Sequence, residues 1–278
     1  MDERRSLLDV EVLSNTPVAP GHFILTLGVP GRMETPVPGQ FVLLHLSRQG
    51  GILLGRPFSI YGFSNHPNGA ALEILYRIVG RGTRAMSLLR KGNSVKLLGP
   101  LGRGFDLPTR ESRIMLVAGG VGMAALVYLS SFIPHEQLSV YLGGKTADVL
   151  VGLDRLENNA SSIKIATDDG SRGFHGPVTK LLSRDFDAGC EMPERIYACG
   201  PVGMLKGLAV TIGGCPAVCQ VSVEERMACG TGVCLGCAMT VKEEGHLVYK
   251  RVCKDGPVFL LSDLAWELPI QDDSLEVE

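Results

Sequence analysis

The stretch Gly99-Pro100-Leu101-Gly102-Arg103-Gly104-Phe105 divides the chain into two regions whose hydrophobic patterns differ. Glycine and proline at this density are typical of a linker. Before the linker, short runs rich in β-branched or alternating apolar residues are separated by turn signals such as Pro38-Gly39. The runs cover residues 8–13, 22–27, 40–46, 56–61, 72–78 and 94–98, and a helix is expected over 84–90. Six strands at this spacing predict a small antiparallel barrel, which we assign to a domain spanning residues 1–105.

After the linker, strand-like runs alternate with helical ones, which is typical of βαβ units around a parallel sheet. Strands are expected at 114–118, 138–142, 163–167 and 195–199, and helices begin near Met123, Val178 and Met204. The pattern predicts an α/β nucleotide-binding domain over residues 106–217. From Val218 the chain becomes rich in cysteine and glycine and then forms a hairpin, so residues 218–278 are assigned to a small third domain. The predicted fold is therefore multidomain, β and α/β.

Composition and charge exclude several kinds of protein. Hydrophobic residues make up 45% of the 278 residues and charged residues 20%, as in a globular protein with a sizeable core. A net charge of −2 without a block of Lys or Arg argues against nucleic acid or an anionic membrane as the partner. The apolar run 117–133 is shorter than the roughly 20 residues of a spanning helix, so we interpret it as strand, turn and helix. The first five residues lack a secretory signal, which favours the reducing cytoplasm.

Four of the eight cysteines have the spacing C-x4-C-x2-C-x15-C. They are Cys229, Cys234, Cys237 and Cys253. The first three match the plant-type ferredoxin spacing, and a hairpin over 238–252 would return the fourth to the loop. Structural zinc and unligated thiols are the alternatives, although zinc sites usually use two C-x2-C knuckles and only one is present. The remaining thiols, Cys190, Cys215 and Cys219, are interpreted as core or surface residues.

Two motifs in the first domain have the chemistry of a flavin site. Arg56-Pro57-Phe58-Ser59 supplies a charged fork for a pyrophosphate, and Ser59 could hydrogen-bond the flavin edge where hydride arrives. Gly80-Arg81-Gly82-Thr83 offers backbone N–H groups to the same anion. A solvated arginine before an edge-strand proline would explain the first motif alone about as well. The combination of the two motifs favours the flavin.

Two strand-to-helix turns in the second domain could bind a nicotinamide dinucleotide. Gly119-Gly120-Val121-Gly122 would let a pyrophosphate approach a helix, although a plain βα packing turn explains it nearly as well. Cys199-Gly200-Pro201 ends a later strand, where Cys199 would either face the nicotinamide or be a buried thiol. Together the two turns favour the nicotinamide interpretation.

The order of these motifs resembles that of the ferredoxin–NADP reductase superfamily. A closer resemblance is to the electron-transfer subunits of two-subunit, NAD-dependent dihydroorotate dehydrogenases. It is carried by the strings Glu224-Glu225-Arg226-Met227-Ala228-Cys229 and Arg251-Val252-Cys253-Lys254-Asp255-Gly256. The resemblance covers nearly the whole chain. It implies that the four cysteines hold a [2Fe–2S] cluster. By resemblance the residues that contact FAD are Arg56, Pro57, Phe58, Ser59, Leu75, Tyr76, Arg77, Gly82 and Thr83. One departure is Met123-Ala124, where the superfamily often has proline after the glycines.

The resemblance also implies an electron path and a partner. Electrons would pass from a flavin of the partner to [2Fe–2S], to FAD and to NAD⁺ as cosubstrate, in pyrimidine biosynthesis. The partner would be an FMN-containing catalytic subunit in a heterotetramer of two plus two, and this chain would contribute no catalytic residue. Asp168-Asp169-Gly170-Ser171-Arg172 could decide between NAD and NADP but points both ways. The rival functions are a subunit of a ferredoxin-linked NADP oxidoreductase or hydrogenase, and a redox-sensing or zinc module.

Overall fold

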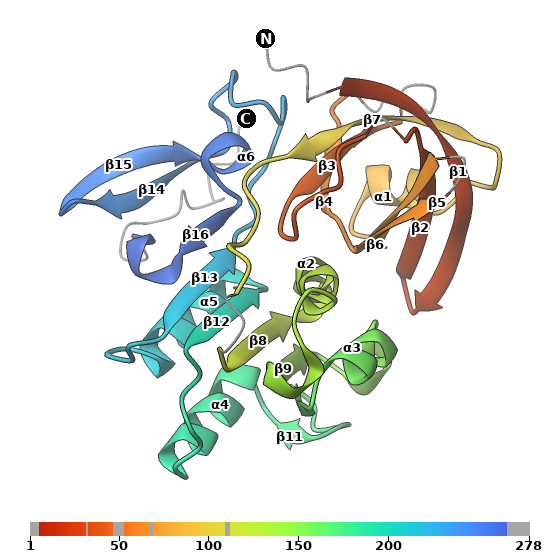
Figure 1. Cartoon of the computed structure of the whole chain (residues 1–278). Coiled ribbons are helices and arrows are strands. Elements are labelled where there is room, and N and C mark those ends of the chain that lie inside the picture. The colour runs from red at the N-terminus through yellow and green to blue at the C-terminus, as the bar shows by residue number, and fades with distance from the viewer. Residues whose placement is uncertain (1–5, 32, 47–52, 67–68, 109–111, 266–278) are drawn as a thin grey trace, which may run out of the picture.

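The computed structural model describes residues 6–31, 33–46, 53–66, 69–108 and 112–265. In these residues the chain forms two seven-stranded sheets and a separate two-stranded hairpin (Figure 1). The acidic C-terminal end of the predicted third domain lies outside the described residues. No helix in the described part of the chain is long and apolar enough to cross a membrane.

The first sheet is antiparallel and has the strand order β4-β3-β7-β1-β2-β6-β5. Its strands are β1 (Ser6–Ala19), β2 (His22–Val29), β3 (Phe41–His45), β4 (Arg56–Ser59), β5 (Gly62–His66), β6 (Gly69–Arg77) and β7 (Ser94–Leu101). The predicted number of six strands is one short, because β5 was missed. Its outer residues Ser64, Asn65 and His66 are polar and exposed, so β5 has no apolar alternation.

The helix in the first domain begins and ends earlier than the predicted range 84–90, which is corrected here. Helix α1 spans Arg81–Met86. The Thr83 hydroxyl accepts hydrogen bonds from the N–H groups of Val79 (2.9 Å) and Gly80 (3.2 Å), which closes the first turn. Gly92, at φ +87°, belongs to the turn that leads into β7. Hydrogen bonds at the first turn therefore set the start of α1, which the hydrophobic pattern alone did not predict correctly.

The second sheet has the order β11-β10-β9-β8-β12-β13-β16 and is parallel except for β16. Its strands are β8 (Ile114–Gly119), β9 (Leu138–Gly144), β10 (Ser162–Thr167), β11 (Phe174–His175), β12 (Arg195–Cys199), β13 (Val218–Ser222) and β16 (Val258–Leu260). The sheet continues past residue 217, since β13 and β16 come from the segment assigned by sequence to the third domain.

The helices of this region are α2 (Met123–Ser130), α3 (Leu153–Asn159), α4 (Val178–Asp187) and α5 (Val202–Thr211), with short 3-10 turns at Gly120–Gly122, His135–Gln137, Ala147–Val149 and Leu261–Asp263. All eight residues of α2 are buried, because α2 lies between the two sheets (Figure 1). This burial explains the apolar run that the sequence shows there. Helix α3 was not expected, and α5 begins two residues before the predicted Met204.

The C-terminal hairpin consists of β14 (Ala238–Glu243) and β15 (His246–Arg251), followed by α6 (Val252–Asp255). Its two-residue loop, Glu244-Gly245, has φ +50° and φ +81° at the two positions. Two left-handed residues in sequence are what a tight hairpin turn requires. Val241 of the hairpin and the flanking residues Cys237 and Val252 belong to the core that also holds Leu43 and Leu101 of the first sheet. The hairpin and the cysteines beside it are thereby packed against both larger sheets.

Candidate functional site

A cavity of about 660 Å³ lies where the first sheet, the second sheet and the chain leading to the cysteines meet. Its wall on the first sheet consists of Phe41, Pro57, Phe58, Ser59, Leu75, Tyr76, Arg77, Val79 and Thr83. Its wall on the side of the second sheet includes Val121 of the first glycine turn, Ala124 of α2 and Val202 at the start of α5. The third wall consists of Ser222, Val223, Glu224, Glu225, Arg226, Met227 and Pro257. The structure thus brings the flavin motif to the same cavity as Val121 of the first glycine turn and Val202, next to the second. The predicted NAD residues Gly119, Gly120, Gly122, Cys199, Gly200 and Pro201 are not themselves among those that line it.

Arg56 and Gly82, both expected to contact FAD, pack directly against each other beside this cavity. A Cβ atom on Gly82 would lie 2.2 Å from Nε and 2.7 Å from Cζ of Arg56. Only a residue without a Cβ admits the guanidinium at this place. Arg56 Nη1 also donates to the backbone oxygen of Leu54. The two motifs, far apart in sequence, therefore form one unit that holds the arginine fork.

The predicted segment Leu75-Tyr76-Arg77 separates into three different environments. Leu75 is buried in the core shared with the second sheet, and Arg77 is exposed. Tyr76 is buried within the first sheet, where its ring stacks on Phe23 at 5.5 Å and its hydroxyl donates to Asn15 at 3.1 Å. Burial raises the pKa of Tyr76 to about 12, so this hydroxyl is neutral at physiological pH.

The two glycine turns of the second sheet pack on each other at the carboxyl ends of neighbouring parallel strands. Ala118 on β8 pairs with Cys199 on β12, and a Cβ on Gly122 would lie 2.6 Å from the Cys199 carbonyl oxygen. The chain leaves β8 toward β9 on one side and later places β12 on the other side. The carboxyl edge between β8 and β12 is therefore the topological switch point, where α/β sheets bind ligands.

Cys199 lies at this switch point, but the residue is only 2% exposed and does not line the cavity. Burial raises the pKa of this thiol well above its usual range, and the neighbouring Glu224 carboxylate adds to the effect. Ser222 hydrogen-bonds the same thiol. The thiol therefore remains protonated and contacts the third wall of the cavity. The backbone carbonyl oxygen of Cys199 contacts Gly122.

The third wall was missed as a site by sequence reasoning. Glu224 lines the cavity and is exposed there. Desolvation by the surrounding protein nonetheless raises the pKa of its carboxyl, while the positive charge of Arg77 opposes the rise. The signal that could have found this wall is its place between the end of β13 and the first cluster cysteine. The wall connects the cavity to Cys229 within a few residues.

The four cysteines lie on a loop and a hairpin whose backbone turns toward the sulfur atoms. Cys229 Sγ accepts hydrogen bonds from the N–H groups of Thr231 (3.4 Å) and Cys234 (3.5 Å), and Cys237 Sγ accepts one from Cys253 N–H (3.4 Å). Burial opposes ionisation of Cys229, but these N–H donors outweigh it and lower the pKa of the thiol to about 5. Amides aimed at sulfur are the environment that a thiolate ligand requires.

Within the described ranges, no three His, Cys, Asp or Glu side chains converge closely enough to hold a single metal ion. A [2Fe–2S] cluster distributes its thiolates over two irons, so its ligands need not meet at one point. The loop adopts left-handed backbone at Gly230, Gly232 and Leu235, with φ of +69°, +84° and +63°. This backbone lets the chain wrap closely, and the donor set and wrap fit an iron–sulfur cluster.

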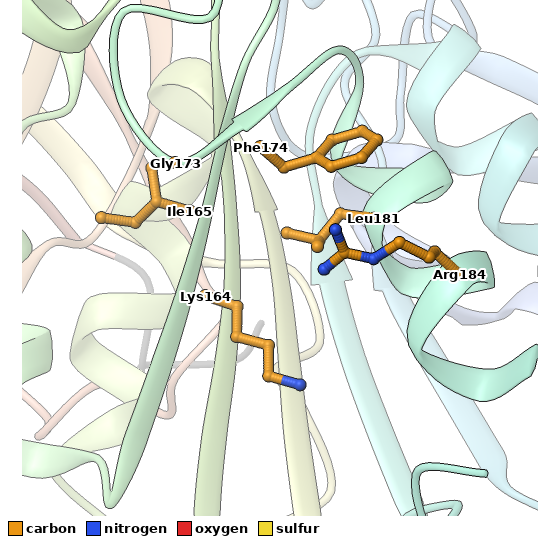
Figure 2. A pocket seen from close by; sticks show the side chains of 6 residues that line it. All are labelled: Lys164, Ile165, Gly173, Phe174, Leu181 and Arg184. Carbon is orange, nitrogen blue, oxygen red and sulfur yellow. The ribbon is translucent and has the colours of Figure 1, made fainter. Parts of the chain in front are cut away.

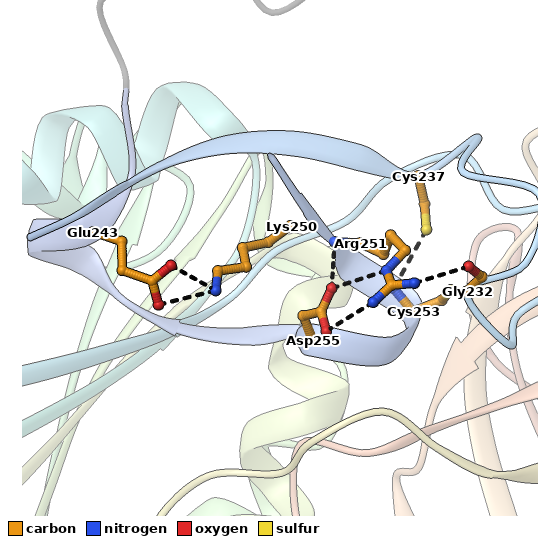
Figure 3. Close-up of polar contacts among 7 residues, drawn as sticks. All are labelled: Gly232, Cys237, Glu243, Lys250, Arg251, Cys253 and Asp255. Carbon is orange, nitrogen blue, oxygen red and sulfur yellow. Dashed lines mark hydrogen bonds and ion pairs between the residues drawn. The ribbon is translucent and has the colours of Figure 1, made fainter. Parts of the chain in front are cut away.

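Arg251 holds this loop against the segment that carries the fourth cysteine (Figure 3). Its Nε donates to Asp255 Oδ2 at 3.1 Å, and its Nη1 donates to the Gly232 carbonyl oxygen at 3.3 Å. The backbone N–H of Arg251 also donates to Asp255, at 2.8 Å. Lys250, the next residue on β15, pairs instead with Glu243 at 2.8 Å, along the hairpin. Arg251 therefore links the two halves of the cysteine site.

A second cavity, of about 350 Å³, lies between β10 and α4 and is lined by Lys164, Phe174 and Arg184 among others (Figure 2). Its two cations share one buried carboxylate, Asp185, at 2.6 Å from Lys164 Nζ and 3.0 Å from an Arg184 nitrogen. Tyr141 also donates to Asp185, at 2.9 Å. Lys164 and Tyr141 of the sheet and Arg184 of α4 all bond the same Asp185 carboxylate, so this network stabilises the packing of α4 on the sheet.

Comparison with known proteins identifies the family. The chain is 37% identical over 263 residues to the dihydroorotate dehydrogenase B (NAD(+)) electron transfer subunit of Desulforamulus reducens, covering 94% of this chain and 99% of the relative. The chain belongs to this family of electron transfer subunits. The corresponding subunit of Caldanaerobacter subterraneus subsp. tengcongensis is 36% identical over 252 residues, with 91% and 96% covered. Residues 224–265 match the model of the iron-sulfur cluster binding domain of dihydroorotate dehydrogenase B.

Solved structures of other reductases share the fold. An NADH-dependent reduced ferredoxin–NADP oxidoreductase is 26% identical, with a TM-score of 0.79 and 94% and 91% of the two chains covered. A ferredoxin NADP⁺ reductase from Neisseria gonorrhoeae with bound FAD and NADP shares the fold, at 17% identity, a TM-score of 0.61 and 76% and 91% covered. The predicted fold, an antiparallel sheet followed by a parallel α/β sheet, is confirmed.

The predicted family and the oxidoreductase function in electron transfer are confirmed as well. The relatives favour this function over the rival subunit of a ferredoxin-linked NADP oxidoreductase or hydrogenase and over a redox-sensing or zinc module. Two of the predicted cofactors agree with the comparisons, since the relative is named for NAD(+) and the matching family model for its iron-sulfur cluster.

Proposed function

We propose that this chain carries FAD and one [2Fe–2S] cluster and passes electrons from a partner subunit to NAD⁺. The observation that carries the proposal is the shared cavity, whose walls come from the flavin motif, the glycine turns and the segment 222–227. That last segment ends two residues before Cys229, so the cavity and the cysteine site are neighbours along one short stretch. The ranges 1–105, 106–217 and 218–278 would hold FAD, NAD and the cluster, in that order.

The residues proposed for FAD occupy one wall of the cavity and the arginine behind it. Pro57, Phe58 and Ser59 on β4 would face the flavin ring, with Ser59 donating to its edge. Leu75, Tyr76 and Arg77 on β6 would support the cofactor together with Thr83, and Arg56 beside Gly82 would pair with the pyrophosphate. The first sheet would thereby act as a flavin-binding barrel. When bound, FAD would accept single electrons from the cluster and donate hydride to NAD⁺.

The residues proposed for NAD lie next to the opposite wall, in the turns that carry Val121 and precede Val202. Gly119, Gly120 and Gly122 would admit the pyrophosphate, and Cys199, Gly200 and Pro201 would border the nicotinamide at the switch point. Gly120 supports this role because no atom lies within 4 Å of the place where its Cβ would be, so the turn is open. The nicotinamide would then reach the flavin from the side of Val121, Ala124 and Val202.

Cys229, Cys234, Cys237 and Cys253 would hold the cluster in a small C-terminal unit, beside a partner. We propose that the partner is an FMN-containing dihydroorotate dehydrogenase catalytic subunit, in an assembly of two plus two chains in the cytoplasm, serving pyrimidine biosynthesis. Val233 and Leu235, between the ligands, are 81% and 61% exposed and so are available to an apolar partner surface. Leu235 holds a left-handed backbone that costs a leucine about 1–2 kcal/mol, which a docking role would explain.

The first test is the visible spectrum and metal content of the chain purified without oxygen. We expect about one FAD and two irons per chain, because each proposed site is complete within the chain. Cys234→Ser should remove the cluster signal and leave FAD bound, whereas Cys190→Ser, at an exposed thiol elsewhere, should change neither. Zinc in place of iron would contradict the cluster.

The second test is co-expression with a catalytic subunit. The isolated chain should oxidise NADH with an artificial acceptor but should not oxidise dihydroorotate, since its three segments are accounted for by the cofactors. The complex should reduce NAD⁺ with dihydroorotate, and Cys234→Ser should abolish that reaction. Oxidation of dihydroorotate by the isolated chain, or by a complex without the cluster, would refute the electron path.

A further inference from the structure

Arg155, on α3 of the second sheet's region, contacts two residues of the first sheet. Its Nη1 and Nη2 donate to the two carboxylate oxygens of Glu73 on β6, at 2.7 and 3.0 Å. Its guanidinium also lies 4.5 Å from the centre of the Tyr61 ring. Such a two-pronged, stacked arrangement is specific to arginine and holds both partners in one geometry.

Two glycines provide the space for this contact. A Cβ on Gly62 would lie 2.5 Å from Glu73 Oε2 and 3.1 Å from Arg155 Nη1. Gly152, one residue before α3, has φ +72°, and a Cβ there would lie 2.7 Å from the Tyr61 hydroxyl oxygen. The Glu73 and Arg155 side chains are 25% and 35% exposed, so the ion pair is partly shielded from water. Both sides of the contact are thus shaped for it.

The contact is connected to both walls of the cavity. Tyr61 follows Ser59 by two residues, and its backbone N–H donates to the backbone carbonyl oxygen of Glu73 at 2.9 Å. Glu73 in turn precedes Leu75, a residue of the flavin wall, by two positions. On the other side α3 packs against α2, which carries Ala124 of the nicotinamide wall. A shift of α3 relative to β6 would therefore change the width of the cavity.

We infer that Arg155 is a positioning residue: its bond to Glu73 and its stacking on Tyr61 set the separation between the flavin wall and the nicotinamide wall. The inference rests on the proposed function. Hydride transfer requires the two reacting atoms about 3–3.5 Å apart, and a misplacement of about 1 Å can cost a hundredfold in rate. Arg155 touches neither cofactor site directly, so it acts through the orientation of α3 and α2.

The experiment compares Arg155→Gln, Glu73→Gln and the charge-reversed pair Arg155→Glu with Glu73→Arg, all as the full chain with FAD. Lys96→Gln is the matched control, because Lys96 pairs with Asp9 at 3.1 Å within the first sheet alone. Stopped-flow mixing with NADH gives the limiting rate of flavin reduction and the apparent Kd for NADH. Hydrogen exchange of α3 and of residues 60–62 reports the domain contact independently of activity.

We expect each single variant to lower the limiting rate about ten- to hundredfold, with unchanged FAD content and an NADH Kd within twofold of the unmodified chain. Exchange should rise in α3 and at 60–62, and the reversed pair should recover part of both losses. Lys96→Gln should behave as the unmodified chain. Should Arg155→Gln fail to fold, Glu73→Gln breaks the same pair from the opposite side.

Two failures are distinguishable. An unmodified chain that binds FAD but is not reduced by NADH would overturn the proposed function and the positioning role together. A normal limiting rate in Arg155→Gln and Glu73→Gln, in a chain that NADH does reduce, would overturn the positioning role alone. A rise in the NADH Kd without a change in limiting rate would also overturn it, because it would make Arg155 a contributor to binding.

Discussion

Replacing Gly82 with alanine should separate the stability of helix α1 from the binding of FAD. A Cβ at Gly82 would lie 2.2 Å from Nε, 2.7 Å from Cζ and 3.0 Å from Cδ of Arg56. Gly82 has no positive φ, so its backbone accepts alanine without strain. The overlap must therefore be relieved by the arginine, which has to leave the place beside the cavity. The perturbation moves the charge without deleting it.

The two energetic effects of Gly82→Ala have opposite signs. Alanine is favoured over glycine inside a helix by about 1 kcal/mol, which should raise the free energy of unfolding of the FAD-free chain. A charge-assisted hydrogen bond contributes about 1.5–3 kcal/mol, and its loss corresponds to a roughly ten- to hundredfold weaker Kd for FAD. A variant that is more stable without FAD and binds FAD less tightly is the expected outcome.

The assay is titration of the FAD-free chain with FAD, followed by flavin fluorescence, together with chemical unfolding of the same preparation. Gly80→Ala is the matched control, since no atom lies within 4 Å of its Cβ position and its φ of −176° is extended backbone. Arg56→Ala gives the loss expected when the charge is removed. Equal FAD affinity in Gly82→Ala and the unmodified chain, or an equal loss in Gly80→Ala, would refute the reasoning.

Three other changes test the remaining parts of the site and fold. Arg251→Gln should loosen the cysteine loop and shift the cluster midpoint potential to more negative values, because it removes a nearby positive charge; a redox titration followed by electron paramagnetic resonance measures this, with Lys250→Gln as the control that should shift it less. Leu235→Gly should raise the free energy of unfolding of the isolated chain by about 0.5–1 kcal/mol while weakening the complex with the catalytic subunit; stronger association instead would contradict the docking role. Burial opposes ionisation of Asp185, but hydrogen bonds from Lys164, Arg184 and Tyr141 outweigh it and lower the pKa of its carboxyl. The contribution of the ionised Asp185 to the stability of the fold is therefore present above the unfolded-state pKa of about 3.9 and is lost as the pH falls through the lower folded pKa. Asp185→Asn should therefore destabilise the chain by about 1.5–3 kcal/mol at neutral pH and flatten the acid limb of the stability curve, and an unchanged acid limb in thermal melts would contradict this assignment.

Local motifs were the parts of the site that could be predicted best. Only a loop and a hairpin are needed to bring the four spaced cysteines together. The structure places the Cys253 N–H against Cys237 Sγ, as the hairpin interpretation requires. The glycine turns after β8 and β12 were expected from strand and helix periodicity, and they pack on each other. In each case the residues lie within a short segment whose backbone geometry is dictated by glycine or by the ligand spacing.

The bounds of elements and the sharing of strands were predicted less well. Strand β5 has polar outer residues and gains its place only by pairing with β6. Strands β13 and β16 were assigned with the cysteines, yet they extend the second sheet, β13 in parallel and β16 in antiparallel pairing. Neighbouring strands supply these hydrogen bonds, and the composition of a segment does not reveal which neighbour it will meet.

The sequence by itself determined the order of three functional segments, the chemistry of each motif and the family. Only the tertiary structure decided that the motifs share one cavity, that Gly82 makes room for Arg56, and that Glu224 faces the space between the walls. It also decided the pairing of Arg155 with Glu73, which lie 82 positions apart. The physical reason is that motif chemistry depends on neighbours along the chain, whereas burial, ion pairing and the width of a cavity depend on residues that meet only after the sheets have packed.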